Sequence, residues 1–512
     1  MLVKSYGAAV QGIDATTITI EVNVSLGIRF FLVGLPDSAV RESHERMLSA
    51  FTYNGYKFPK QQVIINMAPA DIRKEGASYD LPLAMAIMAA NNQISDEKLS
   101  QYIIMGELSL DGTLLPVKGV LPIAIRARED GFKGIIVPLA NANEAAVVDN
   151  LDVIGASNMV EVVDFLNGKN NLSPVHIDTQ KEFSDRCHYI DLDFAEVKGQ
   201  ENVKRAMEVA AAGGHNIIMI GPPGAGKSMI AKRIPSILPP LSLSEALETT
   251  KIHSVSGHLN KGCSLMYQRP FRSPHHTISD VALVGGGSYP QPGEISLAHN
   301  GVLFLDELPE FKRSVLEVMR QPLEDRKISI ARSSLTTEYP ASFMLVASMN
   351  PCPCGYYNHP EKDCVCAPGA VQKYLNKISG PLLDRIDIQI EIIPVPFEDL
   401  SMKQQGEKSA VIRQRVIRAR EIQQERYKNE PGIYCNAQMN TRLLNQYVVL
   451  DDTCKNLLQK AVNLLKLSAR AYDRILKVSR TIADLDGSET VLPKHLSEAI
   501  TYRNLDRENW AG

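Results

Sequence analysis

The sequence predicts a multidomain α/β protein: an α+β domain over residues 1–166, a domain built on an α/β sheet over residues 191–396, and a helical domain over residues 397–512. Three observations support this. Residues 13–26 alternate apolar and polar, residues 217–220 form a short apolar run typical of a buried strand, and apolar residues beyond 396 recur at helical spacing. A polar stretch, residues 167–190, predicts a linker between the first two domains.

Three segments define the first domain. Ile18, Ile20, Val22 and Val24 share one face of residues 13–26, which predicts a half-buried strand. Residues 81–90 form a compact apolar stretch that predicts a buried helix. Residues 135–137, closed by Pro138, predict a short buried strand.

The second and third domains follow the same logic. Residues 203–213 are rich in alanine and end at paired glycines, which predicts a helix that stops there. Residues 216–220 predict the buried strand that follows. Residues 409–428 and 453–485 carry the helical patterns of the last domain.

Composition excludes several classes of protein. The 512 residues correspond to about three domains at roughly 150 residues each. With 55 Lys and Arg against 58 Asp and Glu, the formal net charge is -3, and 44% of residues are hydrophobic. This is ordinary globular composition, neither disordered nor histone-like. Any surface that binds nucleic acid must therefore be local.

Cysteine usage and hydropathy indicate the compartment. Eight cysteines in a chain of this length do not form a typical disulfide framework. Residues 1–17 lack the apolar core of a signal peptide, and no run approaches the roughly 18 apolar residues of a membrane span. We expect a cytoplasmic protein without membrane contact.

A glycine-rich motif directly follows the strand predicted at residues 216–220. It reads Gly221-Pro222-Pro223-Gly224-Ala225-Gly226-Lys227-Ser228, the pattern G-x-x-x-x-G-K-S. Glycines let the backbone N–H groups wrap around phosphate, and the following helix offers its positive N-terminal end. The motif predicts an ATP site in which Lys227 contacts the β- and γ-phosphates and the Ser228 hydroxyl binds Mg²⁺.

Two carboxylates follow a second apolar run. Residues 302–305 predict a buried strand, and Asp306 and Glu307 come directly after it. Open α/β sheets bind ligands at the carboxyl ends of their strands. We expect Asp306 to hold Mg²⁺ and Glu307 to orient and deprotonate the attacking water. Taken alone, the motif is equally well explained by a strand that ends in an acidic turn.

Three further polar residues are candidates for the same site. Residues 343–347 predict a third strand, which leads to Asn350, a side chain suited to positioning water. Arg385 follows Leu382-Leu383-Asp384, and Arg470 lies within a helical stretch. From the pattern alone, surface ion pairs explain the two arginines equally well.

Several motifs resemble those of AAA+ ATPases of the magnesium-chelatase-like branch, and the resemblance covers essentially the whole chain. They are Phe271-Arg272-Ser273-Pro274-His275-His276-Thr277, Gly293-Glu294-Ile295-Ser296-Leu297-Ala298-His299-Asn300-Gly301 and Asn350-Pro351-Cys352-Pro353-Cys354-Gly355. The resemblance implies that Asn350 is sensor 1, that Arg385 is an arginine finger acting on a neighbouring subunit's nucleotide, and that Arg470 is sensor 2 in a helical lid. A finger supplied by a neighbour requires a ring, which the resemblance implies is a hexamer.

The resemblance also implies a function. It implies a helicase that drives branch migration of recombination intermediates, as in natural transformation, with single-stranded and branched DNA and recombination proteins as partners. The main alternative is a chelatase-type ATPase that remodels a protein partner. An ATP-dependent protease and a nucleotide switch without turnover are two others. Glu307 argues against the switch, because a pure switch needs no carboxylate to activate water.

Residues 35–90 resemble the Lon-protease-like domain that also occurs in the recombination protein RadA. Residues 74–78 match the segment that ends in the protease serine, here Ser78, and residues 106–112 match the stretch leading to its catalytic lysine. The ungapped match places Leu121 at the lysine position, and leucine cannot accept the serine proton. Lys118, three residues away, is the one local substitute. We expect a Lon-like domain without protease activity, serving as a ring-forming or DNA-handling scaffold.

Four cysteines cluster directly after Asn350. Cys352 and Cys354 are separated by nine residues from Cys364 and Cys366. Four thiolates at this spacing suit a tetrahedral zinc ion, with His359 as a further candidate ligand. The C-x-C spacing is tighter than the common C-x-x-C. Four reduced cysteines without a metal are the alternative.

Three segments are candidates for contact with DNA. Residues 324–332 and 336–339 predict a hairpin across Ser333-Ser334, with Lys327 and Arg332 as candidate phosphate contacts; a hairpin packed on its neighbour is the alternative. Residues 272–287 form the second candidate, whose His275 and His276 are more often structural than metal ligands. The basic stretch of residues 408–428 is explained equally well by DNA or by a solvated helix.

Overall fold

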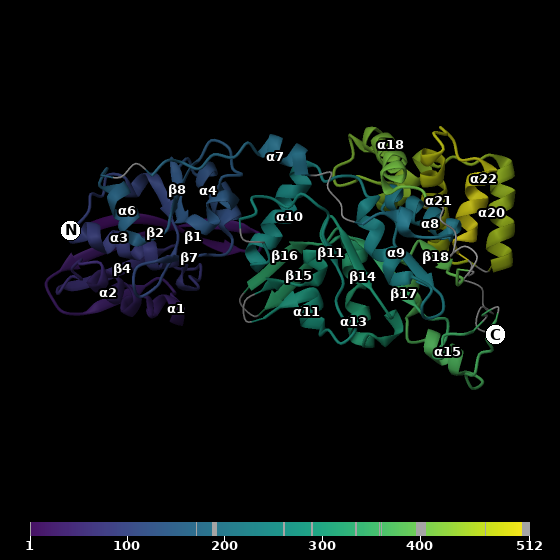
Figure 1. The fold of residues 1–512 in the computed structure, drawn as a ribbon, viewed down its shortest axis with the longest axis horizontal. Helices are drawn as coiled ribbons and strands as arrows, with labels where there is room; N and C mark the ends of the chain where they lie inside the picture. Colours follow the sequence, from purple (N-terminus) through teal and green to yellow (C-terminus); the bar gives the residue numbers. More distant parts are fainter. Residues whose placement is uncertain are drawn as a thin grey trace. The chain divides into compact units, whose positions relative to one another are not determined.

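The computed structural model describes residues 2–503 except 170–171, 187–191, 260–261, 288–289, 333–334, 358, 360, 396–405 and 466. The chain forms two compact units (Figure 1). The first comprises Met1–Arg186 and Ser242–Tyr267, and the second comprises Cys187–Leu241 and Gln268–Gly512.

The first unit is built on a mixed sheet of seven strands in the order β3-β4-β2-β1-β5-β8-β9. The strands are β1 (Leu2–Gln11), β2 (Asp14–Ser25), β3 (Phe30–Val33), β4 (Gln62–Ala68), β5 (Tyr102–Ile104), β8 (Gly134–Pro138) and β9 (Asp152–Ala156). The predicted strand over residues 13–26 is confirmed as β2, whose alternate residues Ile18, Ile20, Val22 and Val24 are buried.

Helices cover this sheet. They include α1 (Ser38–Arg41), α2 (Ser43–Tyr53), α3 (Asp80–Ala90), α4 (Val120–Glu129), α5 (Ala142–Ala145) and α6 (Met159–Leu166), and a small hairpin pairs β6 (Glu107–Leu108) with β7 (Leu114–Leu115). The predicted buried helix is confirmed as α3, in which every residue is buried. The predicted strand at residues 135–137 is confirmed as part of β8.

The polar segment expected to be a linker differs from that expectation. Within residues 167–190, Thr179–Arg186 form helix α7, and the Val175 N–H donates to the Val153 carbonyl of β9. Helix α10 (Leu243–Ser256), which lies within the expected second domain, also packs in the first unit. There Ser254 bonds to Glu144, and its carbonyl accepts from the Gly119 N–H. These contacts join residues far apart in the sequence, so local composition did not indicate them.

The second unit is built on a parallel sheet of five strands in the order β11-β14-β17-β10-β18. The strands are β10 (Ile217–Ile220), β11 (Phe271–Arg272), β14 (Val302–Leu305), β17 (Met344–Met349) and β18 (Ile388–Glu391). All residues of β10, β14 and β17 are buried, as expected for strands covered on both faces. Because the strands are parallel, the segments that follow them meet at one edge of the sheet.

Short elements connect these strands. The helices are α8 (Glu201–Gly213), α9 (Lys227–Arg233), α11 (Asp280–Val284), α12 (Glu294–Leu297), α13 (Arg313–Val318), α14 (Arg320–Asp325), α15 (Ala370–Leu375) and α16 (Gly380–Leu383), and the short strands are β12 (Gly285–Gly286), β13 (Gln291–Pro292), β15 (Lys327–Arg332) and β16 (Leu335–Pro340). Helix α8 confirms the predicted alanine-rich helix. It is capped by Gly214, whose φ of 68° suits a residue without a side chain.

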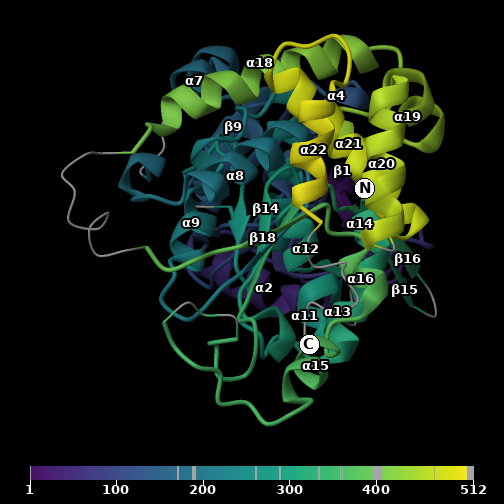
Figure 2. The same cartoon turned by 90° about the vertical axis from the view of Figure 1, so that its right-hand side faces the viewer.

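The last part of the chain is helical, as predicted. Its helices, gathered together in Figure 2, are α18 (Ser409–Tyr427), α19 (Thr441–Tyr447), α20 (Asp452–Leu465), α21 (Ala469–Leu485) and α22 (Pro493–Thr501). The pattern over residues 453–485 is divided between α20 and α21, and the Ser468 side chain caps α21 by accepting from the Ala471 N–H.

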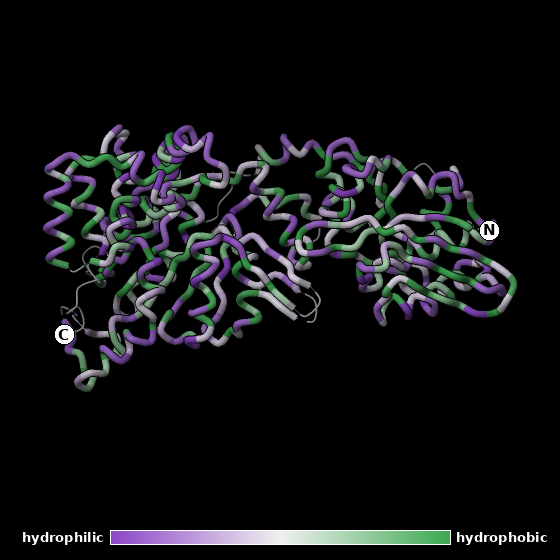
Figure 3. The backbone as a smooth tube through the Cα atoms, turned by 180° about the vertical axis from the view of Figure 1, so that it is seen from behind, coloured by the Kyte–Doolittle hydropathy of each residue, from purple (hydrophilic) through white to green (hydrophobic). Residues whose placement is uncertain are grey.

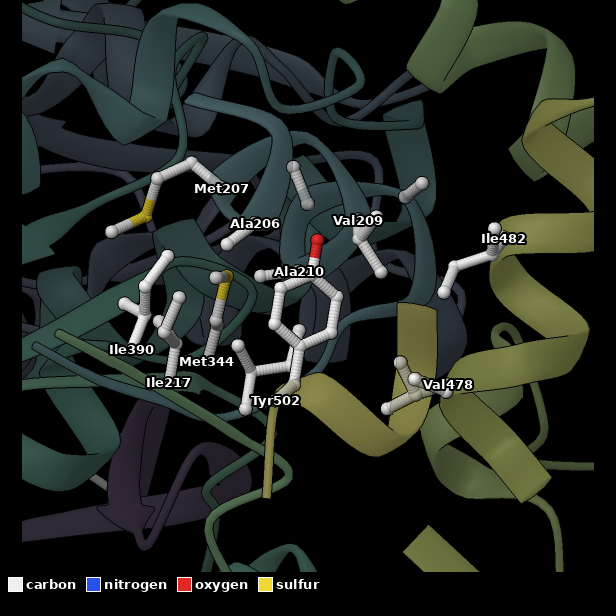
Figure 4. Close-up of a cluster of buried hydrophobic side chains, with 14 of the residues drawn as sticks. Ala206, Met207, Val209, Ala210, Ile217, Met344, Ile390, Val478, Ile482 and Tyr502 are labelled. Carbon is white, nitrogen blue, oxygen red and sulfur yellow. The ribbon is translucent and has the colours of Figure 1, made fainter. Parts of the chain in front are cut away.

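One hydrophobic core joins these helices to the parallel sheet. Val478 and Ile482 of α21 and Tyr502 belong to the same buried cluster as Ala206 of α8 and Ile217 of β10 (Figure 4). Figure 3 shows hydrophilic and hydrophobic residues alternating along the helices of the second unit. None of the described helices has the length and hydrophobicity needed to cross a membrane.

Candidate nucleotide-binding and hydrolysis site

The glycine-rich motif forms a loop between β10 and α9. Gly224 and Gly226 have φ values of 80° and 86°, a left-handed backbone that favours glycine. Gly226 is also the N-cap of α9, so the turn directs the first N–H groups of this helix into the loop. The motif thus has the strand, loop and helix geometry that the sequence predicted.

Lys227 lies inside this loop. Its Nζ donates to the carbonyls of Gly221 and Pro222 at 2.6 and 2.9 Å and to Asn350 Oδ1 at 3.1 Å. Lys227 is buried, and burial holds the pKa of its amine below the usual value. A nearby negative charge stabilises a buried ammonium ion, so Lys227 favours the binding of an anion in this loop.

Asp306 is fixed at the end of β14 by its neighbours. Its Oδ2 accepts from Ser228 Oγ at 2.6 Å, its Oδ1 accepts from Ser348 Oγ, and the Glu307 N–H also donates to Oδ1 at 3.1 Å. Hydroxyl and carboxylate oxygens are the ligands that Mg²⁺ prefers. Ser348 was not among the site residues predicted from the sequence. Its position as a polar residue at the end of β17 could have indicated it.

Glu307 follows Asp306 with a φ of 55°, which is unusual for a residue with a side chain. Its carboxylate is about half exposed, and its Oε2 lies 3.5 Å from Nδ1 of His276. The ring of His276 lies 4.1 Å from that of His275 and 6.4 Å from that of Phe311. Strand β11 precedes His276 and pairs with β14, which explains how a residue 31 positions earlier reaches Glu307.

The two candidate arginines lie elsewhere. Arg385 precedes β18 and so lies at the amino ends of the strands, opposite the glycine-rich motif of residues 221–228, which is called the phosphate loop below. Its carbonyl accepts from Asn216 Nδ2 at 3.1 Å. Its guanidinium is buried and lies 2.5 Å from Glu324. Arg470 is exposed at the start of α21, 3.9 Å from Asp384. The structure therefore places neither arginine beside Lys227 of the same chain.

The four clustered cysteines come together. The Sγ atoms of Cys352, Cys354, Cys364 and Cys366 all lie within 4.8 Å of one another, an arrangement that could hold a metal ion. All four are free thiols. His359 instead accepts hydrogen bonds through Nδ1 from the N–H groups of Glu361 and Lys362.

Two of the candidate DNA segments have internal partners. The predicted hairpin is confirmed as β15 and β16, but Lys327 lies 3.0 Å from Glu338, and Ile328, Ile330 and Tyr339 are buried on one face. The turn Ser333-Ser334 and the side chain of Arg332 lie outside the described residues. In the basic helix α18, Arg415 pairs with Glu208 and Glu407, and Arg426 pairs with Asp484. This favours a structural role for much of its charge.

The structure also shows where the residues of the Lon-like segments lie. Ser78 lies in a short helical turn before α3, and Leu121 is fully buried in α4, where its N–H donates to Glu144. Lys74 is buried and bonds to the Pro69 carbonyl.

The parallel sheet and its phosphate loop define the class, a P-loop protein of the AAA+ type. Comparison with protein families supports it. Residues 193–400 match the family described as magnesium chelatase, subunit ChlI, residues 20–141 match subunit ChlI of Mg-chelatase, and residues 406–503 match its C-terminal family.

Individual relatives narrow the class further. The chain is 44% identical to competence protein ComM of Haemophilus influenzae over 98% of this chain and 97% of the relative. It is 43% identical to the uncharacterized protein YifB of Escherichia coli, over 98% and 96%. A 148-residue stretch is 28% identical to Lon protease 2 of Bacillus subtilis, covering 28% of this chain and 26% of that protein. The chain belongs to the ComM family of magnesium-chelatase-like AAA+ proteins.

The contact between His276 and Glu307 generates a prediction. We expect His276→Ala to lower kcat for ATP hydrolysis by about tenfold. Glu307, the expected general base, would no longer be positioned by His276 and would contribute less to the rate. The affinity for nucleotide should stay within about twofold, because the carboxylate beside His276, Glu307, is expected to act on water and not to bind nucleotide.

His275→Ala is the matched control, since His275 hydrogen-bonds Thr277 at 2.9 Å. Steady-state hydrolysis and fluorescent-nucleotide titration separate the two effects. An unchanged kcat in His276→Ala would show that His276 does not position Glu307. A loss in His275→Ala is expected only as far as removal of the neighbouring ring shifts His276.

Proposed function

We propose that this chain is a Mg²⁺-dependent ATPase that assembles as a hexameric ring and acts in the cytoplasm as a DNA motor promoting branch migration of recombination intermediates. The ATPase proposal rests on one observation. The side chains that meet at the edge of the parallel sheet where the strands end are Lys227, Ser228, Asp306, Glu307 and Asn350. These are the parts that phosphoryl transfer requires: a cradle, a metal site, a base and a water-positioning group.

Each side chain has a role in hydrolysis. Lys227 exchanges its bonds to the Gly221 and Pro222 carbonyls for bonds to the β- and γ-phosphates of ATP. Ser228 and Asp306 would hold Mg²⁺, which neutralises phosphate charge. Glu307 takes the proton of the attacking water, and Asn350, already bonded to Lys227, positions that water.

The placement of the arginines supports a ring. Arg385 and Arg470 lie at the strand end opposite the phosphate loop, and four residues of β10 alone span about 13 Å. An arginine there cannot contact the γ-phosphate of its own chain without a large rearrangement. We propose that both complete the site of the neighbouring subunit. For Arg385 this requires exchange of Glu324 for phosphate at the interface between subunits.

The DNA substrate is supported by kinship and by the N-terminal domain. One relative is a competence protein, and one stretch of the chain is similar to part of Lon protease 2. By its motifs, the N-terminal domain also resembles a domain of the recombination protein RadA. Single-stranded and branched DNA and recombination proteins are the partners we propose. The second candidate is remodelling of a protein partner, which the match to magnesium chelatase subunits favours. We further propose that the four cysteines bind zinc, since tetrahedral thiolate sites suit this ion.

ATP hydrolysis by the full chain tests the DNA proposal. The rate is measured with Mg²⁺ and no DNA, with single strands, with a duplex and with a four-way junction. We expect the greatest stimulation by the junction, and less stimulation in high salt because phosphate contacts release counterions. A rate indifferent to every DNA would refute the DNA motor and favour a protein partner.

Replacing the base gives a second prediction. Glu307→Gln should lower kcat by about 10²–10⁴ while ATP stays bound, because the amide cannot accept the proton from water. Retention of labelled ATP on a filter and phosphate release report the two effects. Glu310→Gln is the control, since Glu310 pairs with Lys377 at 3.3 Å. Normal turnover by Glu307→Gln would contradict its assigned role.

Replacing the proposed finger gives a third. Arg385→Ala should lower kcat by about 10³–10⁵ without weakening nucleotide binding by a single subunit. Mixing Arg385→Ala with Glu307→Gln subunits should restore part of the rate, because some sites then combine an intact Glu307 with an intact neighbouring Arg385. Absence of this complementation in mixed rings would count against action between subunits.

A further inference from the structure

The cysteine loop, residues 351–366, begins where the catalytic strand β17 ends. Asn350 is followed by Pro351 and then by Cys352, which is fully buried. The Gly355 N–H donates to the Cys352 carbonyl at 3.0 Å, so the first two cysteines lie on one tight turn. Whatever holds Cys352 therefore also fixes the backbone two residues from Asn350.

The sulfur atoms are spaced for a single ion. Sγ of Cys352 lies 3.3 Å from that of Cys354 and 3.8 Å from that of Cys364. The Sγ atoms of Cys354 and Cys364 are 3.6 Å apart. A zinc–sulfur bond of about 2.3 Å in a tetrahedron puts the sulfurs roughly 3.8 Å apart. Four thiolates also select a soft or borderline metal over Mg²⁺. Geometry and donor type thus agree on one zinc ion.

The same loop borders the phosphate loop. A Cβ added to Gly355, whose φ is 85°, would lie 2.6 Å from Cδ of Pro223 in the phosphate loop. The lining of a small cavity includes Gly221 and Pro222, residues 391–394, and Pro351, Gly355, Tyr357 and His359 of the cysteine loop. The cysteine loop is therefore a wall of the space next to the phosphate loop.

We propose that zinc bound by the four cysteines holds the cysteine loop against the phosphate loop, so that zinc occupancy sets the affinity of this chain for ATP. Without the ion, four neighbouring thiols supply no bond strong enough to fix the loop. The cysteine loop would then no longer hold Pro223 and Asn350 in place. The phosphate loop would be less ordered before nucleotide binds, and more free energy would be spent on ordering it. The inference rests on the proposed ATP site, because it states how that site is regulated.

The test uses the purified full chain and two readouts, bound metal by mass spectrometry and affinity for a fluorescent ADP analogue. We expect one zinc per chain in the wild type. The double variant Cys364→Ser/Cys366→Ser should lose zinc and bind nucleotide roughly tenfold more weakly, about the effect of one lost hydrogen bond to a charged group. Cys263→Ser, a free cysteine outside the loop, is the control and should keep both properties.

Gly355→Ala separates the contact from the metal. It leaves all four thiols in place, so zinc should stay, but its methyl group must displace Pro223, so affinity should fall. In the wild type with Mg²⁺ in excess, a zinc-selective chelator should weaken binding and added zinc should restore it, which distinguishes regulation from misfolding.

Three results would overturn the inference: a wild type that binds nucleotide but contains no zinc, a zinc-free protein with unchanged affinity, or Gly355→Ala with unchanged affinity. A wild type that binds no nucleotide at all would instead refute the proposed ATPase.

Discussion

The parallel pairing of β11, β14, β17 and β10 is the constraint on which the candidate site depends. Each strand is short, and a residue of the candidate site follows its carboxyl end by one to seven positions: His276, Glu307, Asn350 and Lys227. Parallel strands in register bring those ends together, although the residues span more than a hundred positions. The residues of β10, β14 and β17 are all buried, so a slip along a strand would carry the polar groups that follow it into the interior of the sheet, which opposes such a slip.

Hydrogen bonds then lock the strand ends to one another. Asp306 takes bonds from Ser228 on α9 and from Ser348 on β17, and Lys227 bonds to Asn350. Three strands are thus tied at the point where phosphate is expected. Because these groups are positioned before a ligand enters, little ordering remains to be done on binding, and binding free energy is available for catalysis.

The sequence indicated the parts of the site that are local and missed those that depend on distant contacts. The phosphate loop and the Asp306–Glu307 pair were predictable because each adjoins an apolar strand in the sequence. The contact between His276 and Glu307 was not, since it depends on the pairing of β11 with β14. The packing of α10 in the first unit has the same cause. Charge patterns were ambiguous for a different reason: Lys327 has a partner across a hairpin, which only the register reveals.

The position of the helical domain gives the strongest reason for expecting catalysis to be shared between chains. Arg474, one turn after Arg470, forms an ion pair of 2.9 Å with the buried Asp387. Burial alone would raise the pKa of Asp387, but Arg474 and His215 outweigh it and hold the pKa well below its usual value. Breaking such a buried pair costs about 3–5 kcal/mol. Helix α21 is therefore held at the amino ends of the strands, with Val478 and Ile482 in the core beneath it. A swing that brought Arg470 to its own phosphate loop would break both the ion pair and the core, whereas a neighbour in a ring requires neither change.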